Sequence, residues 1–401
     1  MFQTLDRLSP DAILGLMASF RADPFSQKVD LGVGVYRDER GATPVLEAVR
    51  RAERRVVDAE TTKSYVAAPG REEYNRAVEE LVLGDSHGAR RAGRVRTVQA
   101  PGGCGALRVG AELIRAAAPA AAVFVSEPTW ANHIPLLGSS GLKLERYPYY
   151  APVAHELLFE AMLERLEEAR AGDVVLLHAS CHNPCGADLS LDQWRTLTEL
   201  LARRDLLPFL DLAYQGFGVD LTSDAAGVRW VTEHVPEALI AVSNSKNLGL
   251  YRERLGALIV VSQSTARVEA AYSHVLQIAR SIYSMPPDHG AAIAACIFAD
   301  EELRRTWLEE LARMQSRLAG MRTLLAGTLR AATGTAAFDF IAAQRGMFSM
   351  LGVSPQVVRA LREEHHIYMM QDSRINVAGI TRENVEYVAH AIAAESTRQE
   401  S

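Results

Sequence analysis

Short, continuous apolar runs separated by helical patterns constrain the fold of this chain more than any other feature. Because these runs do not alternate between apolar and polar residues, they predict strands that are covered on both faces, as in a parallel sheet. Helical patterns lie between the runs, so the sequence predicts a doubly wound α/β domain with a mainly parallel sheet. The runs are Ala121–Val125, Val174–Leu177, Leu206–Leu210, Leu239–Val242 and Leu255–Val261.

Two helical patterns extend this interpretation to the rest of the chain. The first covers His155–Arg170 and places its apolar residues on one face. The second covers Glu301–Arg330, where apolar residues recur at spacings of three and four. A coiled coil has a similar pattern. A pattern this short instead favours a single helix that joins two domains. At 401 residues the chain is long enough for two. We expect an N-terminal arm (1–14), a large domain (45–313), and a smaller α+β domain built from 15–44 and 314–401.

Charge and hydropathy exclude several functional classes. The net charge is −6, and no basic block interleaved with aromatic residues stands out, so we expect no nucleic-acid partner. No apolar run reaches the roughly 20 residues that cross a bilayer, and the start of the chain shows no signal peptide. Four cysteines suit a reducing compartment. We therefore expect a cytoplasmic protein without membrane contact. Cys181 and Cys185 lack a second pair that would complete a zinc set, so no metal is expected.

Lys246 is the residue that points most directly to chemistry. Nearly all basic residues of the chain are arginines, and only four are lysines. A primary amine can form a Schiff base with an aldehyde, which an arginine cannot do. Lys246 follows the run Leu239–Val242, sits beside Ser243 and Ser245, and precedes Arg254 by eight positions. An isolated lysine at a strand end is usually a surface residue, but these neighbours favour an anchor for pyridoxal phosphate.

A glycine-rich stretch supplies a candidate phosphate site. Gly102, Gly103 and Cys104 lie between a predicted strand, Arg94–Gln99, and a predicted helix, Gly105–Ala117. Backbone N–H groups at a helix start bind phosphate well. Ser243, Ser245 and Arg254 would complete this cup, since an arginine can bind a phosphate through two parallel hydrogen bonds. Taken alone, the glycines would indicate only a turn.

Asp211 follows the run Leu206–Leu210 and is the candidate partner of the cofactor ring. The ring of pyridoxal phosphate acts as an electron sink while its nitrogen stays protonated, and a nearby carboxylate favours that charged form. Lys246 would then hold the cofactor and move a proton at the substrate Cα. Burial lowers the pKa of such an amine and keeps part of it neutral.

The chain resembles, almost from end to end, the class I pyridoxal-phosphate aminotransferases of fold type I, which include the aspartate and aromatic aminotransferases. Individually these matches would be weak, but their common order and spacing make them specific. The matching stretches are Gly32–Glu39, Pro101–Arg108, Trp130–His133, His182–Gly186, Asp211–Phe217, Ser243–Arg254, Arg280–Ser284, Gly346–Phe348 and Arg374–Gly379.

The resemblance implies further cofactor contacts. His133 would support Asp211, and Trp130 would stack on the ring. Asn183 and Tyr214 would hydrogen-bond the phenolic oxygen of the cofactor. Tyr65 would donate to the phosphate of the cofactor in a partner subunit.

The resemblance also implies how substrates bind. Arg374 would pair with the α-carboxylate of every substrate, and Arg280 would reach across a dimer interface to a side-chain carboxylate. Gly34 would line the substrate site, together with Trp130 and Asn183. If these roles carry over, the active site is complete only in a homodimer.

Four positions depart from the family pattern. Cys104 replaces a threonine or serine in the phosphate loop, and Met285 replaces an asparagine or serine. Met350 stands where an aromatic residue is usual, and Asp372 puts a carboxylate two positions from Arg374. These changes either tune the pocket toward a less common, bulky or basic amino donor or are neutral.

The sequence thus predicts a homodimeric, pyridoxal-phosphate-dependent aminotransferase that moves an amino group between an L-amino acid and 2-oxoglutarate by a ping-pong mechanism. Aspartate is the favoured donor, because Arg280 is present and Val35 and Thr43 match the aspartate-type pattern. An aromatic or specialised donor is the first alternative. A lyase or decarboxylase on the same fold and a non-catalytic cofactor-binding domain are others, but two carboxylate-binding arginines favour exchange of amino and oxo acids. A DNA-binding module would need more residues than precede the matching region.

Overall fold

The centre of the molecule is a seven-stranded sheet in the order β2-β10-β9-β8-β7-β3-β4. The computed structural model describes residues 2–7 and 12–400, so residues 1 and 8–11 of the expected N-terminal arm lie outside the described part. All neighbouring strands are parallel except that β10 is antiparallel to both β2 and β9. The strands are β2 (Val95–Pro101), β3 (Ala122–Glu127), β4 (Lys143–Pro148), β7 (Val174–His178), β8 (Leu207–Leu212), β9 (Ala238–Ser243) and β10 (Leu255–Val261).

Each apolar run in the sequence forms a strand, and the burial explains why the runs are continuous. In β7, Val175 and Leu177 belong to one hydrophobic core while Val174 and Leu176 belong to another. Successive side chains of a strand point to opposite faces, so both faces of the sheet are buried. The predicted mainly parallel, doubly wound sheet is confirmed.

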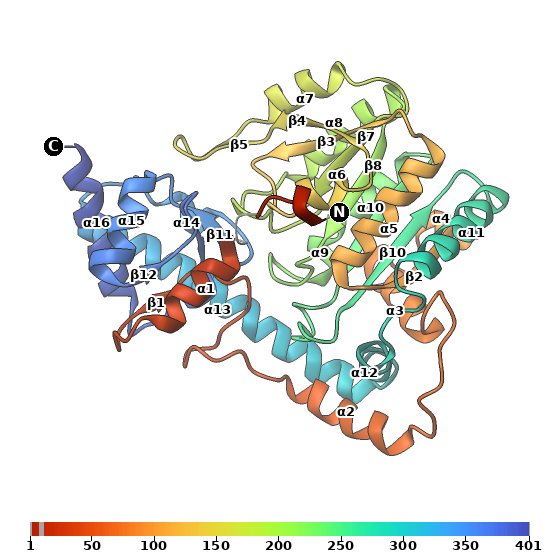
Figure 1. Ribbon diagram of the computed structural model, residues 1–401, viewed down its shortest axis with the longest axis horizontal. Coiled ribbons are helices and arrows are strands. Elements are labelled where there is room, and N and C mark those ends of the chain that lie inside the picture. Colours follow the sequence, from red (N-terminus) through yellow and green to blue (C-terminus); the bar gives the residue numbers. More distant parts are fainter. Residues whose placement is uncertain (1, 8–11, 401) are drawn as a thin grey trace.

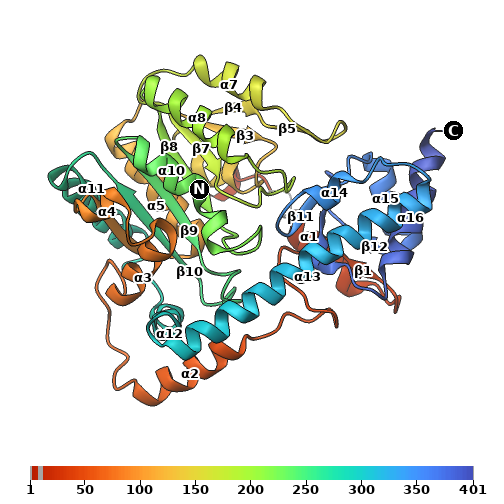
Figure 2. The ribbon, with the colours of Figure 1, turned by 180° about the vertical axis from the view of Figure 1, so that it is seen from behind.

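Helices cover both faces of this sheet (Figures 1 and 2). Those packed on one face include α5 (Gly102–Ala117), α6 (His133–Gly138) and α11 (Thr265–Ile282). The other face carries a larger set: α3 (Glu72–Leu83), α7 (Phe159–Glu167), α8 (Leu191–Arg203), α10 (Ala226–His234) and α12 (Asp288–Ala299). Short helices and 3₁₀ turns complete this part: η1 (Phe2–Thr4), α4 (Gly88–Arg91) and α9 (Leu221–Asp224).

The predicted helix over His155–Arg170 is confirmed only in its middle, because α7 covers Phe159–Glu167. Helix α7 begins at Phe159, whereas His155 has φ 58° and the hairpin β5 (Tyr150–Ala151) with β6 (Glu156–Leu157) precedes the helix. A positive φ at a non-glycine residue is incompatible with a right-handed helix. The apolar spacing therefore identified the helix but not the turn in front of it.

Helix α13 (Glu301–Thr333) runs from the sheet to a second, smaller body, and Figure 1 shows it crossing between them. Asp300 caps its start with a side chain that accepts from Leu303 N, and Gly334 in the left-handed region follows its end. Its first part packs in the core beside the sheet, while Met321 and Leu325 belong to a separate core. The predicted long helix is confirmed.

The second core joins residues from both ends of the chain. Strand β1 (Val29–Asp30) pairs in parallel with β12 (Ile367–Tyr368), and β11 (Phe348–Met350) pairs with β13 (Arg374–Asn376). This arrangement supports the proposed small domain of 15–44 and 314–401 beside a large domain of 45–313, although Phe348 and Met350 pack in the core of the large body. The remaining helices are α1 (Ala12–Ala22), α2 (Glu47–Ala59), α14 (Phe340–Ala343), α15 (Pro355–His365), η2 (Val377–Gly379) and α16 (Val385–Glu400).

Across residues 2–7 and 12–400, no helix combines the length and the apolar character needed to span a bilayer.

Candidate active site

A cavity of about 250 Å³ lies at the carboxyl ends of β7, β8 and β9, between the sheet and the smaller body. Ligands of open α/β sheets bind at this edge. Twelve of the residues selected from the sequence line the cavity: Gly34, Gly103, Cys104, Trp130, Asn183, Asp211, Tyr214, Ser243, Ser245, Lys246, Arg254 and Arg374.

One end of the cavity is suited to a phosphate. Helix α5 begins at Gly102, and no side chain caps its first N–H groups. Those groups and the helix dipole attract an anion. Gly102 is at φ 72°, and a Cβ there would lie 2.6 Å from Arg254 Nη2, so only glycine lets the guanidinium come this close. A Cβ on Gly103 would lie 3.1 Å from Ser243 Cβ, so Ser243 also packs closely against this loop.

The deep side of the cavity holds a carboxylate with a histidine behind it. His133 Nε2 lies 3.1 Å from Asp211 Oδ2, and because an ionised carboxylate only accepts, the imidazole donates. Burial is the largest single effect and would raise the pKa of Asp211, but the hydrogen bond from His133 and the electrostatic effects of His133, His178 and Lys246 together outweigh it, so this pKa is lowered. Asp211 therefore stays ionised and presents a negative charge to the cavity. His133 itself is buried behind the carboxylate and does not line the cavity.

Lys246 borders the same cavity, with its Nζ 4.8 Å from the centre of the Tyr214 ring. Burial lowers the pKa of the Lys246 amine, while Asp211 acts in the opposite direction. Burial raises the pKa of Tyr214, so its phenol remains protonated and able to donate a hydrogen bond. An amine with a neutral fraction and a neutral phenol thus lie together, as general acid–base chemistry requires.

The opposite end is suited to a carboxylate ligand. Arg374 is buried; its Nη1 donates to Asn183 Oδ1 at 3.2 Å and its Nη2 to Gly32 O at 2.9 Å. Its guanidinium carbon lies 4.5 Å from the centre of the Phe348 ring. The buried Nε of Arg374 has no hydrogen-bond partner among the described residues. An unsatisfied buried donor on a cationic group that lines a cavity fits an anionic ligand.

Four of the predicted residues do not line this cavity. Gly102 and His133 adjoin residues that do, whereas Tyr65 and Arg280 lie apart from it. Tyr65 is 90% exposed and lines a separate surface hollow of about 720 Å³ together with Met285. Arg280 is exposed near the end of α11, where its Nη1 donates to Ser284 Oγ at 2.9 Å. The structure of one chain therefore brings the cofactor residues together but leaves Tyr65 and Arg280 apart from them.

The four departures occupy different environments. Cys104 lines the cavity, with Asn132 Nδ2 4.0 Å from its Sγ. Met350 is buried in the core, and Met285 lines the surface hollow. Asp372 is exposed, and its Oδ1 accepts from the backbone N of Arg374 at 3.1 Å. Its carboxylate thus stabilises a turn and does not line the cavity.

Six residues that line the cavity were not selected from the sequence; three of them carry polar or aromatic groups, namely His178, Tyr251 and Phe348, and the others are Ile13, Leu107 and Ala213. His178 follows an apolar run, which is the same signal that selected Asp211. Burial and the charge of His133 lower the pKa of His178 to about 3, so this imidazole is neutral. Its Nε2 lies 3.1 Å from the Thr129 hydroxyl, which also contacts His133. Tyr251 and Phe348 lie inside stretches already matched to the family, so position within those stretches was the available signal.

Comparisons with known proteins agree with this site. The family model described as aminotransferase class I and II matches residues 26–392. The chain is 45% identical to an aromatic-amino-acid aminotransferase of Paracoccus denitrificans over 392 residues, covering 98% of this chain and 99% of the relative. It is 42% identical to the aspartate aminotransferase of Escherichia coli over 394 residues, covering 98% and 100%. An aromatic-amino-acid aminotransferase from Burkholderia pseudomallei, solved covalently bound to pyridoxal phosphate, is similar with a TM-score of 0.96 at 42% identity, covering 99% of each chain.

Proposed function

We propose, from the premise that this chain belongs to the class I and II aminotransferases, that it moves an amino group between an L-amino acid and 2-oxoglutarate with pyridoxal phosphate as cofactor. The observation that carries the proposal is the meeting of Lys246, Asp211 and Arg374 in one cavity. These residues supply an amine for an aldehyde, an anion for a protonated ring and a cation for a carboxylate. Both half-reactions of a ping-pong exchange need all three.

The residues of the cavity fit the cofactor at each end. When bound, pyridoxal phosphate supplies the electron sink for chemistry at the substrate Cα. The N-terminus of α5, Ser243, Ser245 and Arg254 would hold the phosphate. Lys246 would hold the aldehyde carbon and carry the proton at Cα, while Asp211 would keep the ring nitrogen protonated. Trp130 would cover one face of the ring.

Arg374 would bind the α-carboxylate, since its Nε is free to donate. Asn183 orients that guanidinium. Asn183 and Tyr214 would both hydrogen-bond the phenolic oxygen of the cofactor. For a dicarboxylate donor such as aspartate, Arg280 is the second cation that we propose. An aromatic donor is the second candidate, because a relative at 45% identity is named an aromatic-amino-acid aminotransferase.

A homodimer is part of the proposal. Tyr65 and Arg280 lie outside the cavity of their own chain, on exposed segments. An exposed aromatic and an exposed arginine are typical of residues that contact a partner. In a dimer, Arg280 of one subunit would reach the substrate of the other, and Tyr65 the cofactor phosphate. Sedimentation equilibrium at micromolar concentration measures this assembly directly.

A donor panel with 2-oxoglutarate tests the proposed reaction. We expect aspartate to react fastest, with one glutamate formed for each oxo acid. If aspartate is inert and phenylalanine or tyrosine reacts, the aromatic alternative holds instead. Release of carbon dioxide or ammonia without glutamate would indicate a decarboxylase or lyase. The cytoplasmic location stays a prediction, which cell fractionation checks.

A further inference from the structure

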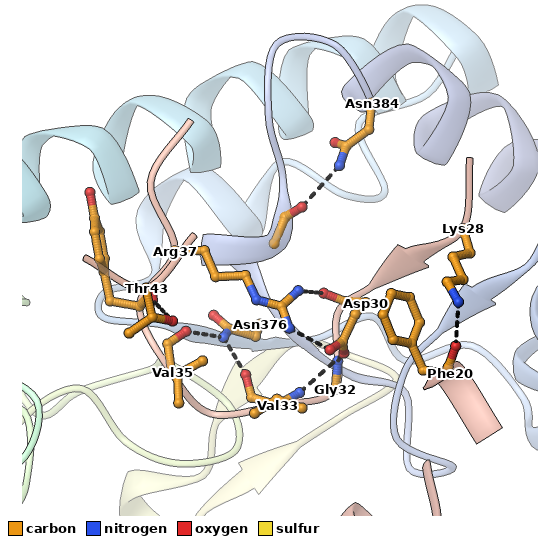
Figure 3. A network of polar contacts seen from close by, with 12 residues as sticks. Phe20, Lys28, Asp30, Gly32, Val33, Val35, Arg37, Thr43, Asn376 and Asn384 are labelled. Atoms are coloured by element: carbon orange, nitrogen blue, oxygen red, sulfur yellow. Dashed lines mark hydrogen bonds and ion pairs between the residues drawn. The ribbon is translucent and has the colours of Figure 1, made fainter. Parts of the chain in front are cut away.

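One ion pair closes the segment that follows β1 into a ring (Figure 3). Asp30 Oδ2 pairs with Arg37 Nη2, and Arg37 Nη1 donates to the Asp30 carbonyl at 3.0 Å. The other carboxylate oxygen of Asp30 accepts from Gly32 N at 2.9 Å. The Asp30 side chain is 5% exposed and that of Arg37 is 20% exposed. Both charged groups therefore direct their hydrogen bonds to this segment.

The ring rests on strand β13. Arg374 and Asn376 are two positions apart on that strand, so their side chains point to the same face. Asn376 Nδ2 donates to Val33 O at 2.5 Å and Val35 O at 2.8 Å, as Figure 3 shows. Arg374 Nη2 donates to Gly32 O at 2.9 Å. The Gly32 carbonyl thus contacts the Arg374 guanidinium directly, while Asn376 holds the neighbouring Val33 and Val35 carbonyls.

We propose that Asp30 and Arg37 are positioning residues for the substrate carboxylate. Their ion pair fixes the Gly32 carbonyl, and that carbonyl orients the Arg374 guanidinium. This role rests on the proposed function, because it assigns Arg374 to the carboxylate that all substrates share. A planar guanidinium binds a carboxylate through two parallel bonds only in a fixed orientation. A small rotation of Arg374 therefore weakens binding of donor and acceptor alike.

Gly32 has little room in which to relax, which makes the ring a sensitive support. A Cβ at Gly32 would lie 2.2 Å from Leu16 Cδ2, so the Leu16 side chain of α1 packs closely against this glycine. In Asp30→Asn, Gly32 N keeps at most a neutral acceptor, and in Arg37→Gln the Asp30 carboxylate loses the partner that holds it in place. The ring thus holds Gly32 between α1 and β13.

The same segment offers a matched control. Glu39 Oε2 lies 3.3 Å from Arg317 Nε, and this second ion pair makes no contact with Gly32. Glu39→Gln removes one negative charge from the segment, as Asp30→Asn does, but leaves the ring closed. An effect of general charge or stability appears in both variants. An effect of carbonyl positioning appears only in Asp30→Asn.

The experiment measures equilibrium binding of 2-oxoglutarate to the holoenzyme by calorimetry, alongside KM and kcat. We expect Asp30→Asn and Arg37→Gln each to weaken binding about tenfold, because small misplacements of a binding group have effects of this order. The double variant should be no weaker than either single variant, since one interaction is lost in each. We expect the kcat of every variant to stay within about twofold of the wild-type value. The affinity of Glu39→Gln for 2-oxoglutarate should also stay within about twofold of the wild type.

A background that lacks the guanidinium separates positioning from general support. In Arg374→Lys, the further change Asp30→Asn should alter 2-oxoglutarate binding less than about twofold. A full tenfold effect in that background, or unchanged binding in both single variants, would overturn the proposal. If Asp30→Asn fails to fold, Arg37→Lys keeps the charge, loses the bond to the Asp30 carbonyl, and should weaken binding about threefold; unchanged binding there overturns the role. A wild-type holoenzyme that binds no 2-oxoglutarate would instead remove the proposed function, and this role with it.

Discussion

The two ends of the active-site cavity are built in different ways. At the cofactor end, Asp211 and Ser243 lie at the ends of neighbouring strands, with Lys246 close behind, so one sheet sets their positions. At the substrate end, Arg374 is held by Gly32, which is 342 positions away in sequence, and Arg280 lies outside the cavity. The comparison teaches that one sheet positions the cofactor residues which this chain supplies itself, to which, by our proposal, a partner adds only Tyr65. The substrate site depends on bringing the chain ends together and, by our proposal, on a second subunit.

Removing Lys246 should have the largest effect and should not distinguish donors. Lys246→Ala leaves no primary amine among the residues that line the cavity. We expect turnover to fall by more than about 10⁴-fold for aspartate and phenylalanine alike, because both the anchor and the proton carrier are lost. Borohydride reduction and peptide mapping should then find no cofactor on the chain. The exposed Lys143 provides the control: Lys143→Ala should keep wild-type activity and labelling at position 246. A loss of turnover that differs between aspartate and phenylalanine would contradict the assignment of Lys246 to the cofactor end of the cavity.

Replacing Asp211 should also affect all donors equally, by a smaller factor. Asp211→Asn keeps the shape but removes the charge that favours a protonated ring. We expect kcat to fall about 10³-fold, in the range seen when a single electrostatic group at a reacting centre is removed. Steady-state kinetics with two donors measures this. A loss that is at least tenfold larger for aspartate than for phenylalanine would place Asp211 at the substrate end.

Arg280 should show the opposite behaviour. Arg280→Gln removes the proposed contact with a side-chain carboxylate, so we expect kcat/KM for aspartate to fall about 10²-fold. For phenylalanine, which lacks that carboxylate, the change should stay within about threefold. Equal losses for both donors would show that Arg280 does not select dicarboxylates.

Mixing two variants that each have low aspartate activity tests whether Arg280 acts across the interface. A hybrid of Lys246→Ala and Arg280→Gln subunits contains one site with an intact Lys246 and an intact Arg280 from the other subunit. We expect aspartate activity to reappear after the two proteins are unfolded together and refolded. No recovery, with hybrids shown by mass spectrometry, would mean that Arg280 serves its own chain.

A pH profile separates His133 from the groups that contact the cofactor. His133 lowers the pKa of Asp211 against the opposing effect of burial. In His133→Asn that pKa should rise, so Asp211 becomes protonated at a higher pH than in the wild type. We expect the acid limb of the kcat profile to move to higher pH, with a loss of about tenfold or less near neutral pH. An unmoved acid limb would show that His133 only fills space behind the carboxylate.

The same contrast explains what could be predicted from the sequence. The buried strands and the residues at their ends were found because a strand covered on both faces has a continuous apolar pattern. Strand β4 was missed because Lys143–Pro148 lies at the sheet edge, where polar side chains reach solvent. The antiparallel direction of β10 could not be predicted, because a buried strand has the same apolar composition in either direction. The ring of Asp30 and Arg37 was missed because its consequence depends on Arg374, and no local pattern reports a contact between the two ends of a chain.

The smallest expected effect concerns Cys104, which lies at the cofactor end and yet departs from the family. A thiol is a weaker hydrogen-bond donor than a hydroxyl, so Cys104→Thr should add one bond to the phosphate, worth about 0.5–1.5 kcal/mol net. Titration of the apoenzyme with pyridoxal phosphate should show binding that is tighter by roughly twofold to tenfold, with the ratio of aspartate to phenylalanine activity unchanged. Cys296→Thr, which lies outside the cavity, is the matched control and should bind the cofactor as the wild type does. If Cys104→Thr alters the ratio of aspartate to phenylalanine activity and leaves cofactor affinity unchanged, position 104 acts on the substrate. The phosphate loop would then contribute to both the cofactor end and the substrate end of the cavity.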